Sequence, residues 1–388
     1  MKNISNGILI VAGNCIGAGM LGMPVVCGIS GFIPSTIIMI IVLLYMNIIS
    51  KIILKANFLF KADNIVILAE KQLGIFGKTI TAILFILLFQ SLLIAYISKS
   101  GELVQGIIKN ITKIEYDIKY YYIIITSITI IITSNRDHII YQTNKILMTS
   151  FVVIFFILIF YLSKNISFLN LTYVNLKTTP YIFPILITAF GFHNIIPSIK
   201  NYYNDYNQIK TIINLGMLLT LIIYTIWNAI ILSTIYTNTS ITYNENKIIT
   251  EAIIENIGIN NSYIIINVFS FIAIITSILG IGISIKEFFT SIFTFKRTII
   301  KNLIHNIVTF IPPLFIININ PKLFFLALDI AGGLFAVMLF GLIPNLIFIK
   351  HYKENKEQYN LLKTKILITI TIFILITFIS TQIYKYTQ

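Results

Sequence analysis

GNCIGAGMLGMP, residues 13–24, interrupts the first hydrophobic segment of the chain. Four glycines and a proline, the residues least able to hold a continuous helix, stand between apolar flanks. An unpaired amide in hydrocarbon costs several kcal/mol, so a broken helix persists at membrane depth only where protein or a polar ligand supplies partners. The stretch therefore predicts a binding site. The alternative is a packing face of small residues, because Gly13 and Gly17 lie one turn apart.

The composition indicates an integral membrane protein. Of the 388 residues, 57% are hydrophobic and 11% are charged, whereas soluble domains carry about 25% charged residues. The net charge of +14 does not predict a nucleic-acid partner, because no basic stripe alternates with aromatic residues, and cationic loops orient membrane proteins. Cys15 and Cys27 lie in apolar sequence without a Cys/His pattern, so we expect no metal site and no cofactor.

Eleven segments are long enough to span a bilayer, at about 20 apolar residues each. They are 5–29, 32–57, 78–108, 119–134, 145–163, 180–200, 208–236, 261–292, 299–318, 323–349 and 364–384. One set of alternate loops holds about twice as many Lys and Arg as the other, which predicts a cytoplasmic N-terminus and a periplasmic C-terminus. Two connections, 62–73 and 244–257, have the spacing of short surface helices.

The sixth segment is interrupted like the first. Its stretch TAFGFHNIIPS, residues 188–198, places Gly, His, Asn and Pro inside an apolar span. Interruptions at corresponding positions five segments apart point to an inverted-repeat transporter. We therefore predict an all-α polytopic membrane protein of 11 transmembrane helices, with a 5+5 inverted-repeat (LeuT-type) fold, broken helices 1 and 6 and one extra helix. Residues 1–163 form the first repeat, 164–349 the second, and 350–388 a cytoplasmic loop and the last helix, all in one membrane domain.

Two such breaks are suited to a zwitterion. Amides of Gly17, Ala18 and Gly19 would open the second half-helix of the first span, whose positive dipole end favours a carboxylate. Carbonyls that end the half-helix before Phe190 could accept hydrogen bonds from an ammonium group, with Phe190 and Phe192 beside the substrate side chain. The predicted substrate-binding residues are Asn14, Gly17, Ala18, Gly19, Met20, Tyr96, Phe190, Gly191, Phe192 and His193.

Ionisable groups at membrane depth are the candidates for coupling or gating. Glu287 lies near an inner gate or proton route, or is an ordinary charge at a helix end. Asp329 stands at an outer gate, or caps an interrupted helix before Gly332 and Gly333. His193 has a suitable pKa range for a proton carrier, but a structural histidine at the break is an equal alternative.

Polar and aromatic residues elsewhere in the spans are weaker signals. Tyr96 could offer its hydroxyl to the substrate carboxylate or only pack between helices. Thr276 and Ser277 could provide hydroxyl ligands, as the same region does in sodium-coupled members of this fold class, or bond only to backbone. Trp227 and the many tyrosines are interpreted as interface anchors or lipid-facing aromatics, without a site.

Several motifs resemble the hydroxy and aromatic amino acid permease family, most of all its tyrosine- and tryptophan-specific branch. They are GNCIGAGMLGMP (13–24), FGFHNIIPSI (190–199), Tyr96-Ile97-Ser98, Thr276-Ser277-Ile278-Leu279-Gly280 with Glu287, and Ile311-Pro312-Pro313 followed by Asn320-Pro321-Lys322. The resemblance runs from about Gly7 to about His351. The chain departs from the family pattern at Lys99, where relatives tend to have a glycine run, and at Lys286 and Asp329.

The resemblance implies a proton symporter of the amino acid/polyamine/organocation superfamily that imports tyrosine or tryptophan across the bacterial inner membrane. Its partners would be the amino acid, the proton and the lipid bilayer. Three alternatives stay open: a permease for serine, threonine or another small zwitterion, an amino acid sensor, and a channel. No catalytic residue is predicted, since the intramembrane acids are unpaired in the sequence and no nucleotide-binding P-loop occurs.

Overall fold

The computed structural model describes residues 4–62, 64–134, 137–235, 260–292, 298–320, 323–354 and 361–387, and every regular element in these ranges is a helix. The half of the chain before the sixth segment forms α1 (Ile4–Cys15), α2 (Ala18–Ser30), α3 (Phe32–Phe60), α4 (Ile65–Thr112), α5 (Ile118–Ser134) and α6 (Asp137–Leu162). Three short 3-10 helices follow, η1 (Ser163–Asn165), η2 (Phe168–Thr172) and η3 (Leu176–Ile182).

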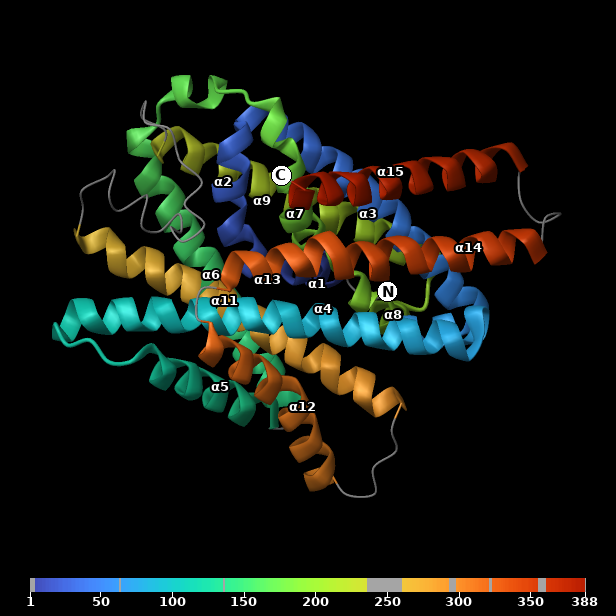
Figure 1. The fold of residues 1–388 in the computed structure, drawn as a ribbon, viewed down its shortest axis with the longest axis horizontal. Coiled ribbons are helices and arrows are strands. Elements are labelled where there is room, and N and C mark those ends of the chain that lie inside the picture. Colours follow the sequence, from blue (N-terminus) through green and yellow to red (C-terminus); the bar gives the residue numbers. More distant parts are fainter. Residues whose placement is uncertain are drawn as a thin grey trace.

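The second half continues with α7 (Phe183–Ala189), η4 (His193–Ile195), α8 (Ile196–Tyr203), α9 (Tyr206–Ile235), α11 (Asn260–Ile292) and α12 (Thr298–Ile319). The last elements are α13 (Phe324–Ile330), the π-helix η5 (Ala331–Leu342), α14 (Ile343–Glu354) and α15 (Leu361–Thr387). In Figure 1, α4 runs beside the continuous series α13, η5 and α14, and α15 lies on the other side of that series.

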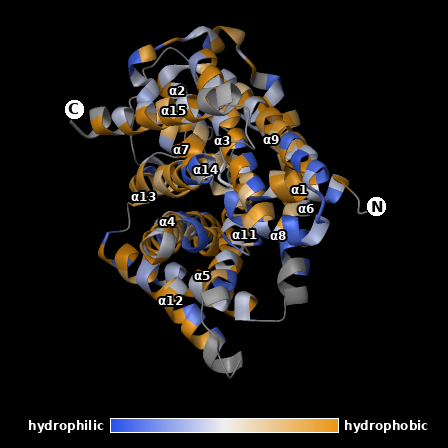
Figure 2. Ribbon diagram, turned by 90° about the vertical axis from the view of Figure 1, so that its right-hand side faces the viewer, coloured by the Kyte–Doolittle hydropathy of each residue, from blue (hydrophilic) through white to orange (hydrophobic). Residues whose placement is uncertain are grey.

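Several helical stretches are long and apolar enough to cross a membrane. Among the described residues eight stretches qualify, two of which, Leu176–Tyr203 and Phe324–Lys353, each run through several labelled elements. The pair α1 and α2 qualifies together with a bend of 57°, and two shorter apolar helices cover Ile118–Ser134 and Ile368–Ser380. Each falls on a predicted segment, and the number that span stays a prediction. Large apolar side chains are exposed on α9 and α12, among them Leu218, Ile222, Ile307 and Phe315, and both ribbons carry hydrophobic, orange residues in Figure 2, as expected for contact with lipid.

The predicted short helix at 62–73 is confirmed. It forms the start of α4, where the Asn64 side chain accepts a hydrogen bond from the Ile67 amide at 2.8 Å. At Gly74 the backbone turns with φ 75° and ψ −167°, a conformation that favours glycine. The short helix packs its buried Leu68 and Ala69 against α14. The second predicted surface helix, 244–257, lies outside the described residues.

The contact between α7 and η5 depends on Gly332. A Cβ added there would lie 1.9 Å from the Pro184 carbonyl oxygen, and backbone cannot move aside as a side chain can. We expect Gly332→Ala to lower stability by about 1–3 kcal/mol, as overpacking does, read as a lower melting temperature of the purified protein in detergent. Gly280→Ala is the control, since a Cβ at Gly280 meets nothing within 4 Å. Equal melting temperatures for the two variants would contradict this.

Candidate functional site

The first helix is broken at Ile16 and Gly17. The helix α1 ends at Cys15 and α2 begins at Ala18, whose amide donates a hydrogen bond to the Ser277 Oγ of α11 at 3.0 Å. A Cβ on Gly17 would lie 2.1 Å from the same Oγ. Glycine is therefore needed for this close approach, and Ser277 supplies the cap that the start of α2 lacks locally.

The break is narrower than the sequence predicts. Gly19, Gly22 and Pro24 all lie inside α2. A Cβ added to Gly22 would lie 2.7 Å from the Ile185 Cδ1, so this glycine lets α2 approach α7, whereas a Cβ on Gly19 would make an ordinary contact of 3.5 Å with the Ala189 Cα. Gly22 is thus a close-packing position on α2, which the predicted packing face of Gly13 and Gly17 did not include. The interpretation as a break holds for Gly17.

The second broken helix is confirmed as well. The helix α7 ends at Ala189, Phe190 to Phe192 are not helical, and α8 begins at Ile196 after the single turn η4. The Asn194 Nδ2 donates to the Ser284 Oγ at 2.8 Å. Ser277 and Ser284 are seven residues apart and so share one face of α11. That face therefore contacts both breaks.

One tyrosine joins the two breaks. The Tyr224 hydroxyl of α9 lies 2.6 Å from the Cys15 carbonyl oxygen and 3.0 Å from the Ala189 carbonyl oxygen, and donates to them. These carbonyls belong to the last residues of α1 and α7, where the helix dipole is negative. The Phe190 ring packs edge-on against Tyr224, with centroids 5.4 Å apart. The two half-helix ends thus meet at a single buried phenol. We call this meeting point of Cys15, Ala189 and Tyr224 the junction.

The predicted substrate-binding residues lie at or near this junction, and most are buried. The buried ones are Gly17, Ala18, Gly19, Met20, Tyr96, Phe190, Phe192 and His193, whereas Gly191 is half-buried. Asn14 is exposed on the last turn of α1. Tyr96 is 6% exposed and lies on α4. Because the junction is closed to solvent, a substrate could reach it only after helices separate.

His193 is held as the structural alternative describes. Its Nε2 lies 3.0 Å from the Met46 carbonyl oxygen of α3, and its ring stacks on Phe340 of η5 at 5.0 Å. These contacts fix the ring between two elements at the second break. The role of His193 as a proton carrier stays a prediction.

The two acidic candidates lie away from the breaks along the chain. Glu287 is exposed on α11, one turn beyond Ser284. Asp329 is half-buried on α13, which passes directly into η5. The interpretation of Asp329 as the cap of an interrupted helix is therefore wrong, because wide π-turns carry the helix through Gly332 and Gly333. The gating roles of both acids stay predictions.

Sequence reasoning missed the contribution of α9. The Trp227 side chain is 2% exposed and its Nε1 donates to the Met20 carbonyl oxygen at 3.1 Å. Its interpretation as an interface anchor is therefore wrong. Tyr224 and Trp227 are three residues apart, so both face the first broken helix. That spacing is the only sequence signal, and it is common in apolar helices.

Thr276 and Ser277 both donate their hydroxyls to the Ala273 carbonyl oxygen, which agrees with backbone bonding. Ser277 also accepts from Ala18 across the helix contact. Among the described residues no group of three His, Cys, Asp or Glu side chains could hold a metal ion. The polar groups at the junction are therefore helix ends, hydroxyls and one imidazole.

Two broken apolar helices that meet at their carbonyl ends inside a helical membrane protein define the class of polytopic transporters. The chain belongs to the tryptophan/tyrosine permease family, whose model matches residues 1–382.

Similar proteins agree with this class. Tyrosine-specific transport system 1 of Haemophilus influenzae is 27% identical, over 93% of this chain and 90% of the relative. The tryptophan-specific transport protein of the same organism is 25% identical, over 89% and 87%. Glutamine transporter 2 of Aliivibrio fischeri is 25% identical, over 90% and 89%.

A solved structure shares the fold. Mhp1, a nucleobase-cation-symport-1 family transporter in a closed conformation with bromovinylhydantoin bound, superposes with a TM-score of 0.59 over 97% of this chain and 92% of its own. At 14% identity this likeness concerns the fold alone. It is consistent with a transporter architecture for the chain.

Proposed function

We propose that the protein is a proton symporter that imports an aromatic amino acid, tyrosine or tryptophan, across the bacterial inner membrane. The observation that carries the proposal is the Tyr224 hydroxyl, which bonds to the terminal carbonyls of both interrupted helices. The start of α2 packs against the end of α7, since a Cβ added to Gly19 would lie 3.5 Å from the Ala189 Cα, so opposite kinds of helix end meet beside this hydroxyl. Transport of the two named amino acids by relatives in the family supports the substrate class.

The junction offers one partner for each group of the substrate. The start of α2, at Gly17 to Gly19, favours the α-carboxylate through its positive dipole end. At the end of α7 the Ala189 carbonyl oxygen, which accepts from the Tyr224 hydroxyl in this closed state, is the acceptor that the α-ammonium would take over. The aromatic side chain then lies against Phe190 and Phe192, with the Tyr96 hydroxyl as a further donor to the carboxylate.

Alternating access follows from which helices hold the breaks. The bundle of α1, α2, α3, α7, α8 and α9 contains both of them and rocks against the other helices. The hydrogen bonds from Ser277 to Ala18 and from Asn194 to Ser284 cross the boundary between that bundle and α11. They therefore stabilise the closed state and must be exchanged when the site opens. Proton and substrate drive net uptake by favouring the same state.

Uptake of labelled tyrosine into proteoliposomes tests the proposal. With an inward proton gradient, we expect accumulation above the external concentration, abolished by a proton uncoupler and competed by tryptophan and phenylalanine but not by serine. Tyrosine uptake that is insensitive to the uncoupler would rule out proton coupling. Flux that never exceeds the external level indicates a channel, and binding without flux indicates a sensor.

A second candidate substrate is glutamine or another small zwitterion. One relative of similar identity and coverage is named a glutamine transporter. Membership of the family therefore does not determine which amino acid is transported. The same competition decides between them. If glutamine or serine competes and tryptophan does not, the aromatic assignment is wrong while the proposed transport cycle stands.

A further inference from the structure

The helix α4 contains a buried ion pair outside the junction. The Lys99 Nζ bonds to the Glu102 Oε2 at 2.5 Å, one turn further along the helix. The Lys99 side chain is 5% exposed and the Glu102 side chain 32%. The ammonium is therefore enclosed by protein, whereas the carboxylate is partly exposed at the protein surface.

The pair lies well inside the helix. Lys99 follows the apolar run 80–97 and stands thirteen residues before the end of α4 at Thr112, about 20 Å along the axis. A charge at this depth is costly unless it is paired. Among the described residues, Glu102 is the only carboxylate that forms an ion pair with Lys99.

The surroundings of the pair are tightly packed. Ser98 and Ser100 are buried on either side of Lys99. A Cβ added to Gly101 would lie 2.3 Å from the ring of Tyr122 on α5, so the two helices touch here. Tyr122 is itself buried. A change of charge on the pair is therefore expected to alter the packing of α4 against α5.

The pair also neighbours a predicted substrate-binding residue. Lys99 follows Tyr96 by three residues, so their side chains are neighbours on one face of α4. Tyr96 is buried, at 6% exposed. A movement of Lys99 is therefore expected to displace Tyr96 first.

We propose that Glu102, paired with Lys99, is the site that binds the transported proton, an inference that rests on the proposed symport. With both groups ionised the pair is neutral and α4 can stay closed on α5. Protonation of Glu102 leaves the Lys99 ammonium buried without a counter-charge, which is strongly unfavourable. The closed packing is then less stable than one that brings Lys99 toward water. The proton gradient in this way biases the conformational equilibrium.

Other titratable groups occur on the helices that pack against α4. They include Tyr122 on α5, Asp117 just before α5, and Asp329 on α13. On α12, His305 contacts Thr309 of its own helix. On α11 the charged residues are Lys286 and Glu287. The experiment therefore compares Glu102 with the acids Asp329 and Glu287.

The test measures labelled-tyrosine uptake by proteoliposomes at several external pH values, together with tyrosine counterflow, which needs no gradient. We expect Glu102→Gln to reduce the acid stimulation of uptake about tenfold or more, within the usual range of coupling, while counterflow continues. The double variant Lys99→Met/Glu102→Gln removes both charges, leaves no lone buried charge, and should show counterflow without acid stimulation.

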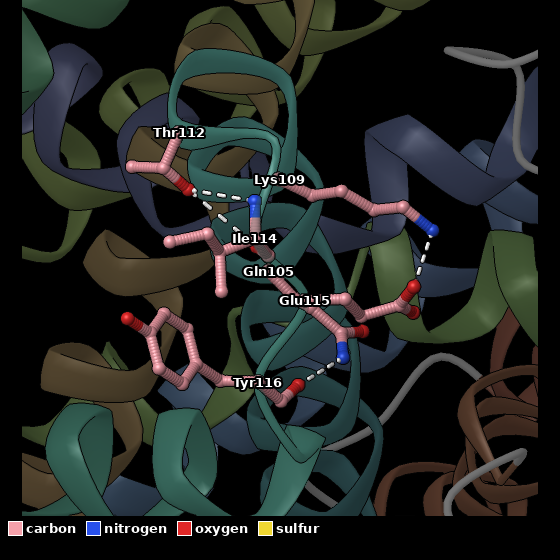
Figure 3. Close-up of polar contacts among 6 residues, drawn as sticks. All are labelled: Gln105, Lys109, Thr112, Ile114, Glu115 and Tyr116. Atoms are coloured by element: carbon pink, nitrogen blue, oxygen red, sulfur yellow. Dashed lines mark hydrogen bonds and ion pairs between the residues drawn. The ribbon is translucent and has the colours of Figure 1, made fainter.

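Glu115→Gln is the matched control. Lys109 and Glu115 form a second ion pair at the end of α4, where the Gln105 side chain also donates to the Tyr116 carbonyl (Figure 3). Both members are more than half exposed, at 56% and 57%, so screening makes this pair weak. We expect unchanged acid stimulation in this variant.

Different results contradict the proposed symport and the proposed proton site at Glu102. A wild-type protein without acid-stimulated tyrosine uptake contradicts the proposed symport itself. Full acid stimulation in the double variant, or its loss in Asp329→Asn or Glu287→Gln but not in Glu102→Gln, shows that Glu102 does not bind the transported proton.

Discussion

Tyr224→Phe should lower tyrosine uptake about 10- to 100-fold without unfolding the protein. The substitution removes the one proton that the Cys15 and Ala189 carbonyls share and keeps the ring that packs on Phe190. Leaving a buried acceptor unsatisfied costs about 1–3 kcal/mol, and here the cost falls on the contact that holds the two breaks together. The measurement is the initial rate of uptake at matched protein content in proteoliposomes.

Tyr45→Phe provides the control for loss of a buried phenol. Tyr45 is 2% exposed and its hydroxyl has no hydrogen-bond partner within the described part of the chain. Removing that hydroxyl leaves no acceptor unsatisfied, so uptake should stay within about twofold of wild type. Comparable losses in the two variants would show that Tyr224 acts through its bulk and not through its hydrogen bonds.

Both interruptions were predictable from the sequence because each combines residues that helices reject with an apolar surrounding. Residues 16–17 and 190–192 are where the chain leaves the helix. The extent of the first break was not predictable, since Gly19 and Gly22 have the same local character as Gly17. They differ only in what faces them, the backbone and side chains of α7. Tertiary contact decides which glycine bends the chain.

The residues that complete the junction gave little signal for a related reason. Tyr224 and Trp227 lie in an apolar helix of a chain that has 21 tyrosines, and a phenol facing a helix end has the same sequence neighbours as one facing lipid. Its role follows from where α9 packs, which periodicity does not specify. Ser277 was noticed only through a family motif, and its partner Ala18 is 259 residues away.

Gly17 and Ser277 should behave as one unit. A Cβ on residue 17 would occupy the position of the Ser277 Oγ, 2.1 Å away, but would lie 3.5 Å from the Ser277 Cβ, an ordinary contact. The backbone at Gly17, with φ −162°, is accessible to any residue. Gly17→Ala therefore acts by turning the Ser277 hydroxyl away from the Ala18 amide, not by straining the chain.

This makes the two substitutions non-additive. Ser277→Ala removes the cap of α2, which is worth about 1 kcal/mol, and Gly17→Ala removes the same cap while also crowding the hydroxyl. In the double variant the hydroxyl that alanine would crowd is gone, so its uptake should be no lower than that of Gly17→Ala alone. Initial rates and melting temperatures of the four proteins complete the cycle. If the two losses multiply, Gly17 matters for a reason other than the approach of Ser277 to the start of α2.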